Sequence, residues 1–259
     1  MPFHTNDGVR YLTFESFPQE IVHAVFTRQG GLSPEPWRSL NLGGNVGDER
    51  ERVVENRQRA FRALGRDPHS LFDVWQIHGA DVVIAVSTGA PHPPEFKADA
   101  ILTDQPNLTL FMRFADCVPV LLCDPRKGVV GVVHAGWQGT VKQVAREAVK
   151  AMQAAYQSHP ADILAAIGPS IGPDHYEIGA DVIERVRATF KDDAETLLQT
   201  HKGRTYFDLW SANRLTLEQA GVSQVEVTGL CTACHTHDWF SHRAEKGQTG
   251  RFGALIALA

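Results

Sequence analysis

The chain has 259 residues, 43% of them hydrophobic, a length that suits one large domain or two small ones. Its 25 basic and 30 acidic residues give a net charge of −5, and the basic residues are scattered, so the sequence does not indicate a nucleic-acid-binding surface. The longest apolar stretches, such as Val118–Cys123, are strand-sized and too short to span a bilayer. Neither nucleic acid nor a membrane is therefore expected as a partner.

Four helices are predicted from start signals and from the spacing of apolar residues. The first begins at Asp48, with Glu51 placed as in a capping box, and ends at Gly65. The others follow Thr140, cover Asp181–Phe190 and start at Asp208.

Between the first two helices, short apolar or alternating runs separated by turn residues predict strands. These strands are Leu71–Gln76, Asp81–Val86, Leu108–Arg113, Val118–Asp124 and Val129–His134. Later strands are predicted at Ile163–Ile167, Val225–Leu230 and Ala254–Leu258. The Pro-rich segment Ala90–Pro94 is expected to be a loop rather than a domain boundary, because strand-like segments flank it closely.

Successive strands without intervening helices argue against a doubly wound parallel sheet. They favour an α+β fold with mixed β-sheets and helices packed on the outside. Because no repeat, low-complexity tract or linker interrupts the sequence, we expect a single compact domain over residues 1–259.

The cysteine content and the start of the sequence bear on the cellular compartment. The segment MPFHTNDGVR lacks the positively charged region and the apolar run of a signal peptide. With four cysteines and no secretion signal, we expect a reduced, cytoplasmic protein without a disulfide framework. The 12 histidines are numerous for this length and are compatible with a metal site, but their number does not identify one.

Three short segments each place a good metal ligand at the end of a predicted strand: His78 in QIHG, Cys117 in ADCVP and His134 in VHAGW. Two imidazoles and one thiolate make a tetrahedral zinc site with one open position, which is typical of catalytic zinc. The alternative is that each histidine is a hydrogen-bonded structural residue and that the cysteine is a small buried hydrophobe. Long gaps separate the three residues, so spacing alone does not identify the site.

Six segments in order resemble the YfiH-like family, once labelled multi-copper polyphenol oxidase or laccase-domain and now regarded as purine nucleoside phosphorylases with deaminase activity. The segments are Phe26–Ser33 (FTRQGGLS), Ser39–Gly43 (SLNLG), Gln76–Gly79 (QIHG), Ala115–Cys117 (ADC), His134–Thr140 (HAGWQGT) and Gly168–Gly172 (GPSIG). The likeness runs from about Val22 to the C-terminus. It implies that His78, Cys117 and His134 bind zinc and are the catalytic residues.

The resemblance also favours substrate contacts by Arg28 and Arg251, for which an ordinary surface role is the alternative. Asn41 can hydrogen-bond a base or a ribose, or it can stabilise its own loop. The segment Gly168–Gly172 can form an anion-binding nest or a rigid turn. Asp116 is expected to point away from the ligands by strand alternation, and it suits the orienting of a ligand better than the role of catalytic acid.

The C-terminal region contains two further features. Ala244 stands where the family commonly has a second arginine, and Glu245 replaces the usual aspartate. A compact group can be read as a second metal site or a redox pair, although it is too compact for all of its side chains to close on one ion. This group comprises Cys231, Cys234, His235 and His237.

The expected function is that of a zinc-dependent purine nucleoside phosphorylase with adenosine deaminase and methylthioadenosine phosphorylase activity. Its partners would be purine nucleosides and phosphate, and copper is the less favoured metal. An open zinc position activates water for deamination, and arginine is suited to hold phosphate for phosphorolysis.

Three other interpretations of the function remain open. A copper oxidase is disfavoured because the sequence has one His-x-His pair, His235-Thr-His237, and few methionines. The resemblance also implies, as an alternative, a hydrolase that edits peptidoglycan precursors. It would be either a zinc amidase or a metal-free enzyme with Cys117 as nucleophile and His134 as base. A non-enzymatic module would need a fourth metal ligand, for which His237 is a candidate.

Overall fold

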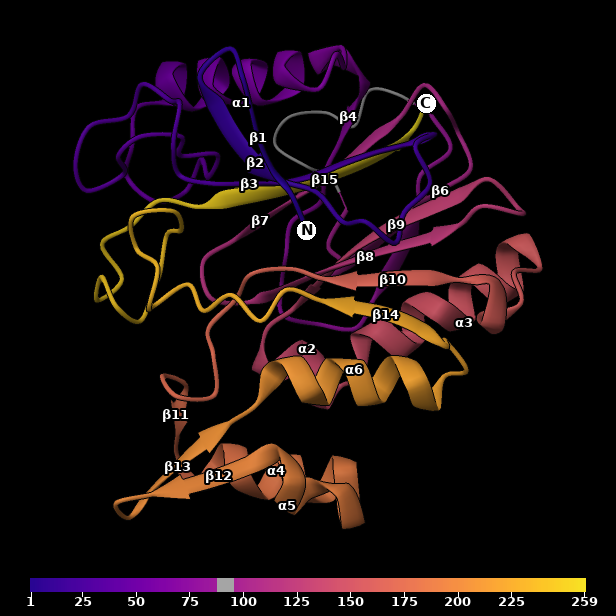
Figure 1. Cartoon of the computed structure of the whole chain (residues 1–259), viewed down its shortest axis with the longest axis vertical. Helices are drawn as coiled ribbons and strands as arrows, with labels where there is room; N and C mark the ends of the chain where they lie inside the picture. The colour runs from indigo at the N-terminus through magenta and orange to yellow at the C-terminus, as the bar shows by residue number, and fades with distance from the viewer. Residues whose placement is uncertain (88–95) are drawn as a thin grey trace.

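The computed structural model describes residues 1–87 and 96–259, so the predicted loop Ala90–Pro94 lies outside the described residues. Two six-stranded sheets lie face to face, and helices cover their outer faces (Figure 1). A small three-stranded sheet lies beyond the helices that cover the second sheet. This arrangement confirms the predicted α+β class with mixed sheets and external helices.

The first sheet is built around a strand from the C-terminal end of the chain. Its order is β1 (Phe3–Asn6), β2 (Val9–Leu12), β3 (Ile21–Phe26), β15 (Phe252–Leu258), β7 (Thr109–Phe114) and β4 (Leu71–Phe72). Strand β15 pairs antiparallel with both neighbours, so that Leu255 lies between Ala24 and Phe111. The two ends of the sequence are therefore joined in one sheet.

The second sheet carries most of the candidate site. Its order is β14 (Gln224–Val227), β10 (Leu164–Ile167), β8 (Val118–Asp124), β9 (Val129–Ala135), β6 (Ala100–Thr103) and β5 (Val82–Ile84). Its four central strands are antiparallel, whereas β14 and β5 at the edges pair parallel with their neighbours. The tight β8–β9 hairpin places Pro119 opposite His134.

The helices lie on opposite sides of the paired sheets (Figure 1). Helix α1 (Arg50–Ala63) covers the first sheet, and α2 (Trp137–Val141), α3 (Val144–Tyr156) and α6 (Leu209–Gln219) cover the second. The small sheet, β11 (Glu177–Ile178), β13 (Arg204–Phe207) and β12 (Leu198–His201), lies beside α4 (Ala180–Phe190) and α5 (Ala194–Leu197). Short 3-10 helices occur at Pro68–Ser70, Pro160–Asp162 and Lys191–Asp193.

The core forms because buried strands alternate their side chains between two apolar layers. In β8, Val120 packs under the helices, while Leu121 and Cys123 pack between the two sheets. In β7, Met112 points between the sheets, and Phe111 contacts the layer beneath α1. Each fully buried Val, Leu or Phe contributes about 1.5–3 kcal/mol to the free energy of folding before entropy is counted.

Two details of the helix prediction are wrong. Helix α1 begins at Arg50, and no capping box forms, because the Asp48 carboxylate instead accepts hydrogen bonds from Ser33 and Asn41 as well as from the Glu49 N–H. The helix predicted after Thr140 is two helices, since Gln143 adopts a left-handed conformation (φ 58°) between α2 and α3. The Asp208 start is confirmed, because its side chain accepts a hydrogen bond from the Ser211 N–H.

Strand lengths also differ from the prediction. The run Leu71–Gln76 forms only the short β4, followed by a bridge between Trp75 and Lys97. The strands near the N-terminus and the β12–β13 hairpin were not predicted. Strand β1 and the hairpin strands are short and mostly polar, whereas β3 (Ile21–Phe26) has the apolar, buried pattern of a strand and could have been predicted. Within residues 1–87 and 96–259, no helix combines the length and apolar character needed to cross a membrane.

Candidate active site

The fold brings His78, Cys117 and His134 together. Cys117 directly precedes β8 and His134 lies near the end of the neighbouring β9, so the hairpin register places both at one end of the second sheet. His78 comes from the turn before β5 and has a positive φ of 56°. One ligand atom from each residue lies within 4.8 Å of the other two, and Sγ of Cys117 is 4.0 Å from Nε2 of His78.

Asp99 orients two of these three residues. Its buried carboxylate accepts a 2.8 Å hydrogen bond from Nδ1 of His134. It also accepts hydrogen bonds from the backbone N–H groups of Ile77, His78 and Gly79 at 3.1, 3.0 and 2.6 Å. A carboxylate that binds the far nitrogen of a histidine fixes the ring and leaves Nε2 available to a metal.

Asp99 is not among the site residues predicted from the sequence. The available signal was a charged residue flanked by Ala98 and Ala100 at the entry to the buried strand β6. A carboxylate that is 0% exposed needs hydrogen-bond partners, so this position could have been marked as a functional candidate.

Gly136 allows the ligands to approach one another. A Cβ atom at this position would lie 2.8 Å from Sγ of Cys117 and 3.2 Å from Cδ2 of His78. The first distance is shorter than side-chain packing allows. A glycine at position 136 is therefore required for Cys117 and His78 to approach each other.

The local charges favour a thiolate. Burial alone would raise the pKa of Cys117, but the positive charge of His134 and hydrogen bonds from His134 and His78 lower it to about 6. Burial alone would lower the pKa of His134, but the Cys117 charge and the Asp99 hydrogen bond raise it to about 9. Without a metal, these pKa shifts favour a thiolate–imidazolium pair at neutral pH, and a cation can replace the proton that the pair shares.

These residues fit a zinc ion. One thiolate and two imidazoles are ligands that zinc prefers, and three protein ligands leave one position for water or substrate. The buried histidine also has the carboxylate partner typical of metal-bound histidines. The open side of the site faces a cavity.

The cavity has a volume of about 880 Å³ and is rich in arginine. Arginine residues that line it are Arg50, Arg57, Arg113, Arg243 and Arg251, and Asp116 is the one carboxylate among its described lining residues. Aromatic and apolar side chains line it as well: Trp75, Trp137, Ile171, Tyr176 and Leu209. A protein with a net charge of −5 thus has a positively charged cavity that suits an anion beside a flat ring.

Arg251 lies in this cavity, as expected of a substrate contact. One guanidinium nitrogen donates to the carbonyls of Thr249 and Gly250 at 3.2 and 2.8 Å, and the side chain packs against Gly43. Burial lowers the pKa of Arg251, while Cys117 and Asp116 act to raise it. Arg251 therefore lines the same cavity as His78, Cys117 and His134.

Asn41 is fully buried and does not line the cavity. Its side-chain oxygen accepts hydrogen bonds from the N–H groups of Gly43 and Arg251, and its amide donates to Asp48. These contacts correspond to the loop-stabilising alternative. Asn41 positions two residues of the cavity wall without reaching the cavity itself.

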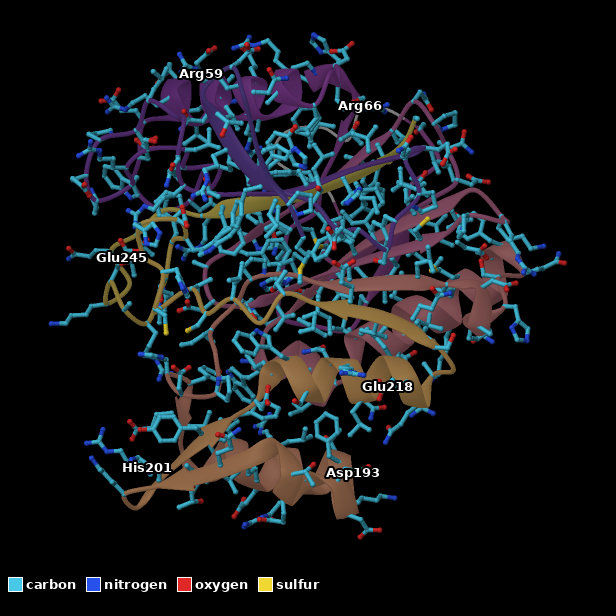
Figure 2. The ribbon with its side chains drawn as sticks, viewed as in Figure 1. Arg59, Arg66, Asp193, His201, Glu218 and Glu245 are labelled. Carbon is cyan, nitrogen blue, oxygen red and sulfur yellow. The ribbon has the colours of Figure 1, made fainter. Side chains whose placement is uncertain are left out.

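The structure does not bring Arg28 to the cavity. Its guanidinium donates to the carbonyls of Arg38 and Thr236 and to Oε1 of Glu245, and it lies over the Phe240 ring at 4.4 Å. Glu245 lies in the loop before β15 (Figure 2). These contacts show Arg28 holding that loop in place, with Glu245 as its partner.

Asp116 is not directed away from the site, in contrast to the expectation. It lies in a bend with φ 80°, where strand alternation does not apply, and its carboxylate is in the cavity wall. The carboxylate accepts hydrogen bonds from Oγ1 of Thr232 at 2.6 Å and from the Arg243 N–H at 2.7 Å. Asp99, rather than Asp116, orients the candidate ligands His78 and His134.

The segment Gly168–Gly172 forms a rigid turn. Its backbone N–H groups are directed at protein acceptors, namely the carbonyls of Pro119, Leu230 and Asp116 and the Sγ atom of Cys231. An anion-binding nest needs free N–H groups, so the turn reading is favoured. Ile171 is the residue of this segment that lines the cavity.

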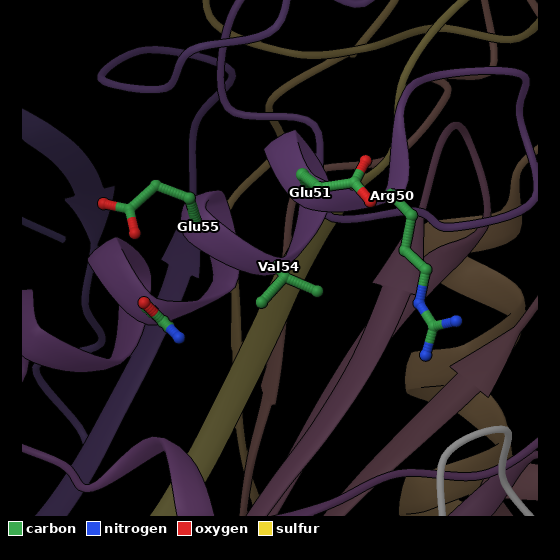
Figure 3. Close-up of a pocket in the computed structure, with 5 residues that line it drawn as sticks. Arg50, Glu51, Val54 and Glu55 are labelled. Carbon is green, nitrogen blue, oxygen red and sulfur yellow. The ribbon is translucent and has the colours of Figure 1, made fainter.

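A second hollow of about 300 Å³ lies on the outer face of α1 (Figure 3). Arg50, Glu51, Val54, Glu55 and Gln58 line it. The Glu55 carboxylate is occupied by Arg59 and Arg62, and the lining contains no histidine or cysteine. Of these two cavities, only the larger one is lined by histidine and cysteine side chains.

Comparison with known proteins agrees with this picture. Residues 22–259 match the family described as multi-copper polyphenol oxidoreductase laccase. A relative from Deinococcus radiodurans named purine nucleoside phosphorylase is 40% identical over 92% of this chain and 89% of its own length. The Escherichia coli purine nucleoside phosphorylase YfiH is 35% identical over 93% of this chain and 95% of its own length.

Solved structures share the whole fold. The Bacillus licheniformis protein YfiH superposes with a TM-score of 0.93 at 34% identity, covering 100% of this chain and 99% of that one. YlmD from Geobacillus stearothermophilus gives a TM-score of 0.92 at 35% identity, covering 99% and 98%. This α+β chain with a His–Cys–His centre belongs to the YfiH family of laccase-like domains.

Proposed function

We propose that the protein is a zinc-dependent purine nucleoside phosphorylase that also deaminates adenosine and cleaves methylthioadenosine. The observation that carries the proposal is one cavity in which the His78–Cys117–His134 centre meets arginine and aromatic side chains. Relatives named purine nucleoside phosphorylase support the first activity.

The metal would be held by His78, Cys117 and His134. When bound there, zinc would supply Lewis acidity and lower the pKa of water. Asp99 would keep the ring of His134 in the orientation that directs Nε2 at the ion, through the 2.8 Å hydrogen bond to Nδ1.

Phosphorolysis requires phosphate to be held against the ribose while the purine leaves. Arginine holds phosphate through paired, charge-assisted hydrogen bonds. Arg251 is the proposed phosphate contact because it lines the cavity. Its Cβ and Cγ atoms pack against Gly43, the first residue of the lining loop Gly43–Val46. Arg50 and Arg243 also line the cavity and would raise the local concentration of the anion, whereas Arg57 and Arg113 are paired with Asp73.

The purine would lie against the aromatic wall. Trp137 and Tyr176 line the cavity, and Arg243 lies 5.2 Å from the Tyr176 ring centre. Burial raises the pKa of Tyr176, so its hydroxyl stays protonated and can donate a hydrogen bond to the base. Deamination needs a group that gives a proton to departing ammonia, and His242 and Asp116 are the other titratable lining residues that can approach a ligand.

The proposal is tested by measuring bound metal and products together. Wild type and Cys117→Ala are assayed for zinc by mass spectrometry, then incubated with adenosine and methylthioadenosine with and without phosphate. We expect about one zinc at this centre, adenine only with phosphate, and inosine without it. Both products should be lost in Cys117→Ala. Zinc-loaded wild type that leaves every purine nucleoside unchanged would contradict the proposal.

A hydrolase acting on peptidoglycan precursors is the second candidate. It is favoured by one observation: Cys117, His134 and Asp99 are arranged as nucleophile, base and orienting carboxylate. A zinc-bound thiolate is a poor nucleophile, so metal content separates the two functions. Purified protein that is metal-free and cleaves an amide substrate would favour the hydrolase.

Copper polyphenol oxidation is less well supported, despite the description of the family. Among the described residues, two groups of side chains can hold a metal ion. One contains two histidines, His78 and His134, and the other contains only His175. Multicopper oxidases need many more histidines. All four cysteines are free, which suits a reducing compartment and the proposed cytoplasmic location.

A further inference from the structure

A second cluster of metal-binding side chains lies outside the cavity. Asp174, His175, Cys231 and Cys234 each offer one ligand atom, and these four atoms lie within 4.8 Å of one another. The histidines next to the CxxC pair are not part of it. His235 is hydrogen-bonded through Nδ1 to the Cys231 carbonyl, and His237 pairs with Asp238.

Four of the six distances between the ligand atoms are close to those of a tetrahedral metal site. With Zn–S bonds of about 2.3 Å and Zn–N or Zn–O bonds of about 2.0 Å, sulfur lies about 3.5 Å from nitrogen or oxygen, and nitrogen about 3.3 Å from oxygen. Here Nδ1 of His175 is 3.8 Å from Sγ of Cys231 and 3.6 Å from Sγ of Cys234. Oδ2 of Asp174 is 3.6 Å from the Cys234 sulfur and 3.0 Å from Nδ1 of His175.

Backbone interactions bring the two halves of the cluster together. Ser170 pairs with Cys231 in a parallel bridge, and the Gly172 N–H donates to Sγ of Cys231 at 3.2 Å. A Cβ atom at Gly172 would lie 2.7 Å from Oδ1 of Asp174 and 3.1 Å from Cβ of Cys231. A side chain at position 172 would therefore clash with Asp174 and crowd Cys231, so a glycine there lets the two residues come together. An N–H donor to sulfur stabilises a thiolate in metal sites.

We propose that Asp174, His175, Cys231 and Cys234 bind a structural zinc ion, separate from the His78–Cys117–His134 centre. Four protein ligands fill a tetrahedral shell, which is typical of structural zinc, whereas the first centre leaves a position open. Two thiolates favour zinc over magnesium or calcium. Binding releases two thiol protons to solvent, and exposed Asp174, His175 and Cys234 give the ion a path of entry.

The ion would stabilise one wall of the cavity. Tyr176, which lines the cavity, directly follows the ligand His175. Thr232, which directly follows the ligand Cys231, holds the Asp116 carboxylate, and the Arg243 side chain donates to the His175 carbonyl at 3.4 Å. The ion would cross-link the turn before β11 to the turn after β14, and both turns contact the cavity lining.

The test counts zinc in the intact chain. Wild type, Cys231→Ala/Cys234→Ala and the matched control His237→Ala are saturated with zinc, freed of excess metal and measured by mass spectrometry. We expect the double variant to hold one zinc fewer than wild type and the control to hold the same number. The count is a difference between variants, so it does not depend on nucleoside activity or on occupancy of the Cys117 centre.

Two further measurements keep the test decisive. Cys234→Ser changes one exposed side chain, and circular dichroism verifies that it is folded before its zinc is counted. Cobalt(II) loading reports the ligands, because thiolate-to-cobalt absorption should fall in both cysteine variants and persist in His237→Ala. Equal zinc in wild type and a folded cysteine variant would overturn the proposal. So would a thiol titration of the denatured wild type that finds a Cys231–Cys234 disulfide.

Discussion

Nδ1 of His134 donates a 2.8 Å hydrogen bond to the carboxylate of Asp99, and both side chains are buried. The same carboxylate accepts the backbone N–H of His78. One aspartate therefore sets the ring orientation of one candidate ligand and the backbone position of another. The geometry of the candidate metal centre therefore depends on a residue that is not one of its three candidate ligands.

Replacing Asp99 with asparagine should weaken zinc binding about 10–100-fold, as loss of a carboxylate behind a metal-bound histidine does elsewhere. The affinity is measured by competition with a coloured chelator. Asp124→Asn is the matched control, because Asp124 is equally buried but accepts its hydrogen bonds from the turn residues Arg126 and Lys127. Equal affinity in Asp99→Asn and wild type would contradict the role given to Asp99.

Metal-free protein should react with iodoacetamide first at Cys117. The pKa of this thiol is lowered to about 6, so the thiolate fraction, and with it the reaction rate, rises through pH 6 and levels off above it. Burial together with Cys231 and Asp174 raises the pKa of Cys234 to about 12, so this exposed thiol should react slowly at pH 7.

Both labelling rates, of Cys117 and of Cys234, are measured by peptide mass spectrometry after timed labelling between about pH 5 and 9. This range includes the ordinary pKa of a cysteine thiol. Zinc added beforehand should protect Cys117. A Cys117 rate that still climbs above pH 8, as for an ordinary thiol, would show that the thiolate–imidazolium pair does not form.

Arg251→Ala should raise the KM for phosphate about 10–100-fold, since a hydrogen bond to a charged group contributes about 1.5–3 kcal/mol. Deamination of adenosine, which uses no phosphate, should change much less. The two rates are measured on the same preparation, with the exposed Arg214→Ala as control. A parallel fall of both activities would indicate that Arg251 supports the cavity rather than binding phosphate.

Asp48→Asn should lower the free energy of unfolding at pH 7 by about 1–3 kcal/mol, because a buried hydrogen-bonded carboxylate is lost. Burial opposes ionisation, but hydrogen bonds from Asn41 and Ser33 lower the Asp48 pKa below its ordinary value of 3.8. A carboxylate with a lowered folded-state pKa stabilises the protein above its unfolded-state pKa, and this contribution disappears as pH falls through the folded-state value.

The difference between wild type and Asp48→Asn should therefore be largest at neutral pH and shrink below pH 3.8. Urea denaturation across this range measures it. Asp192→Asn serves as control, since Asp192 is exposed. A difference that grows on acidification would contradict the assignment.

The fold class could be predicted because buried strands appear in the sequence as continuous apolar runs. The runs that became β8 and β9 are continuous and apolar, and the Asp208 start of α6 is marked by its capping side chain. The start of α1 was misplaced because the Asp48 carboxylate binds Ser33 and Asn41 in the preceding loop, and the capping-box pattern does not include these partners.

The site was only partly accessible to sequence reasoning. Cys117 and His134 border neighbouring strands, but their proximity depends on the β8–β9 register. Asp99 has no motif of its own, and its role follows from three-dimensional contact. The compact cysteine cluster suggested His235 and His237 as neighbouring ligands, yet the chain fold brings in Asp174 and His175 instead.

The central position of β15 has a kinetic consequence. Leu258 pairs with Ile21 and Ala254 with Val25, so the middle of the first sheet closes between segments more than 200 residues apart. Contacts this distant along a chain cost loop entropy before they contribute stability, which slows folding. Arg251 directly precedes β15, so the cavity should acquire this guanidinium only when that late strand docks.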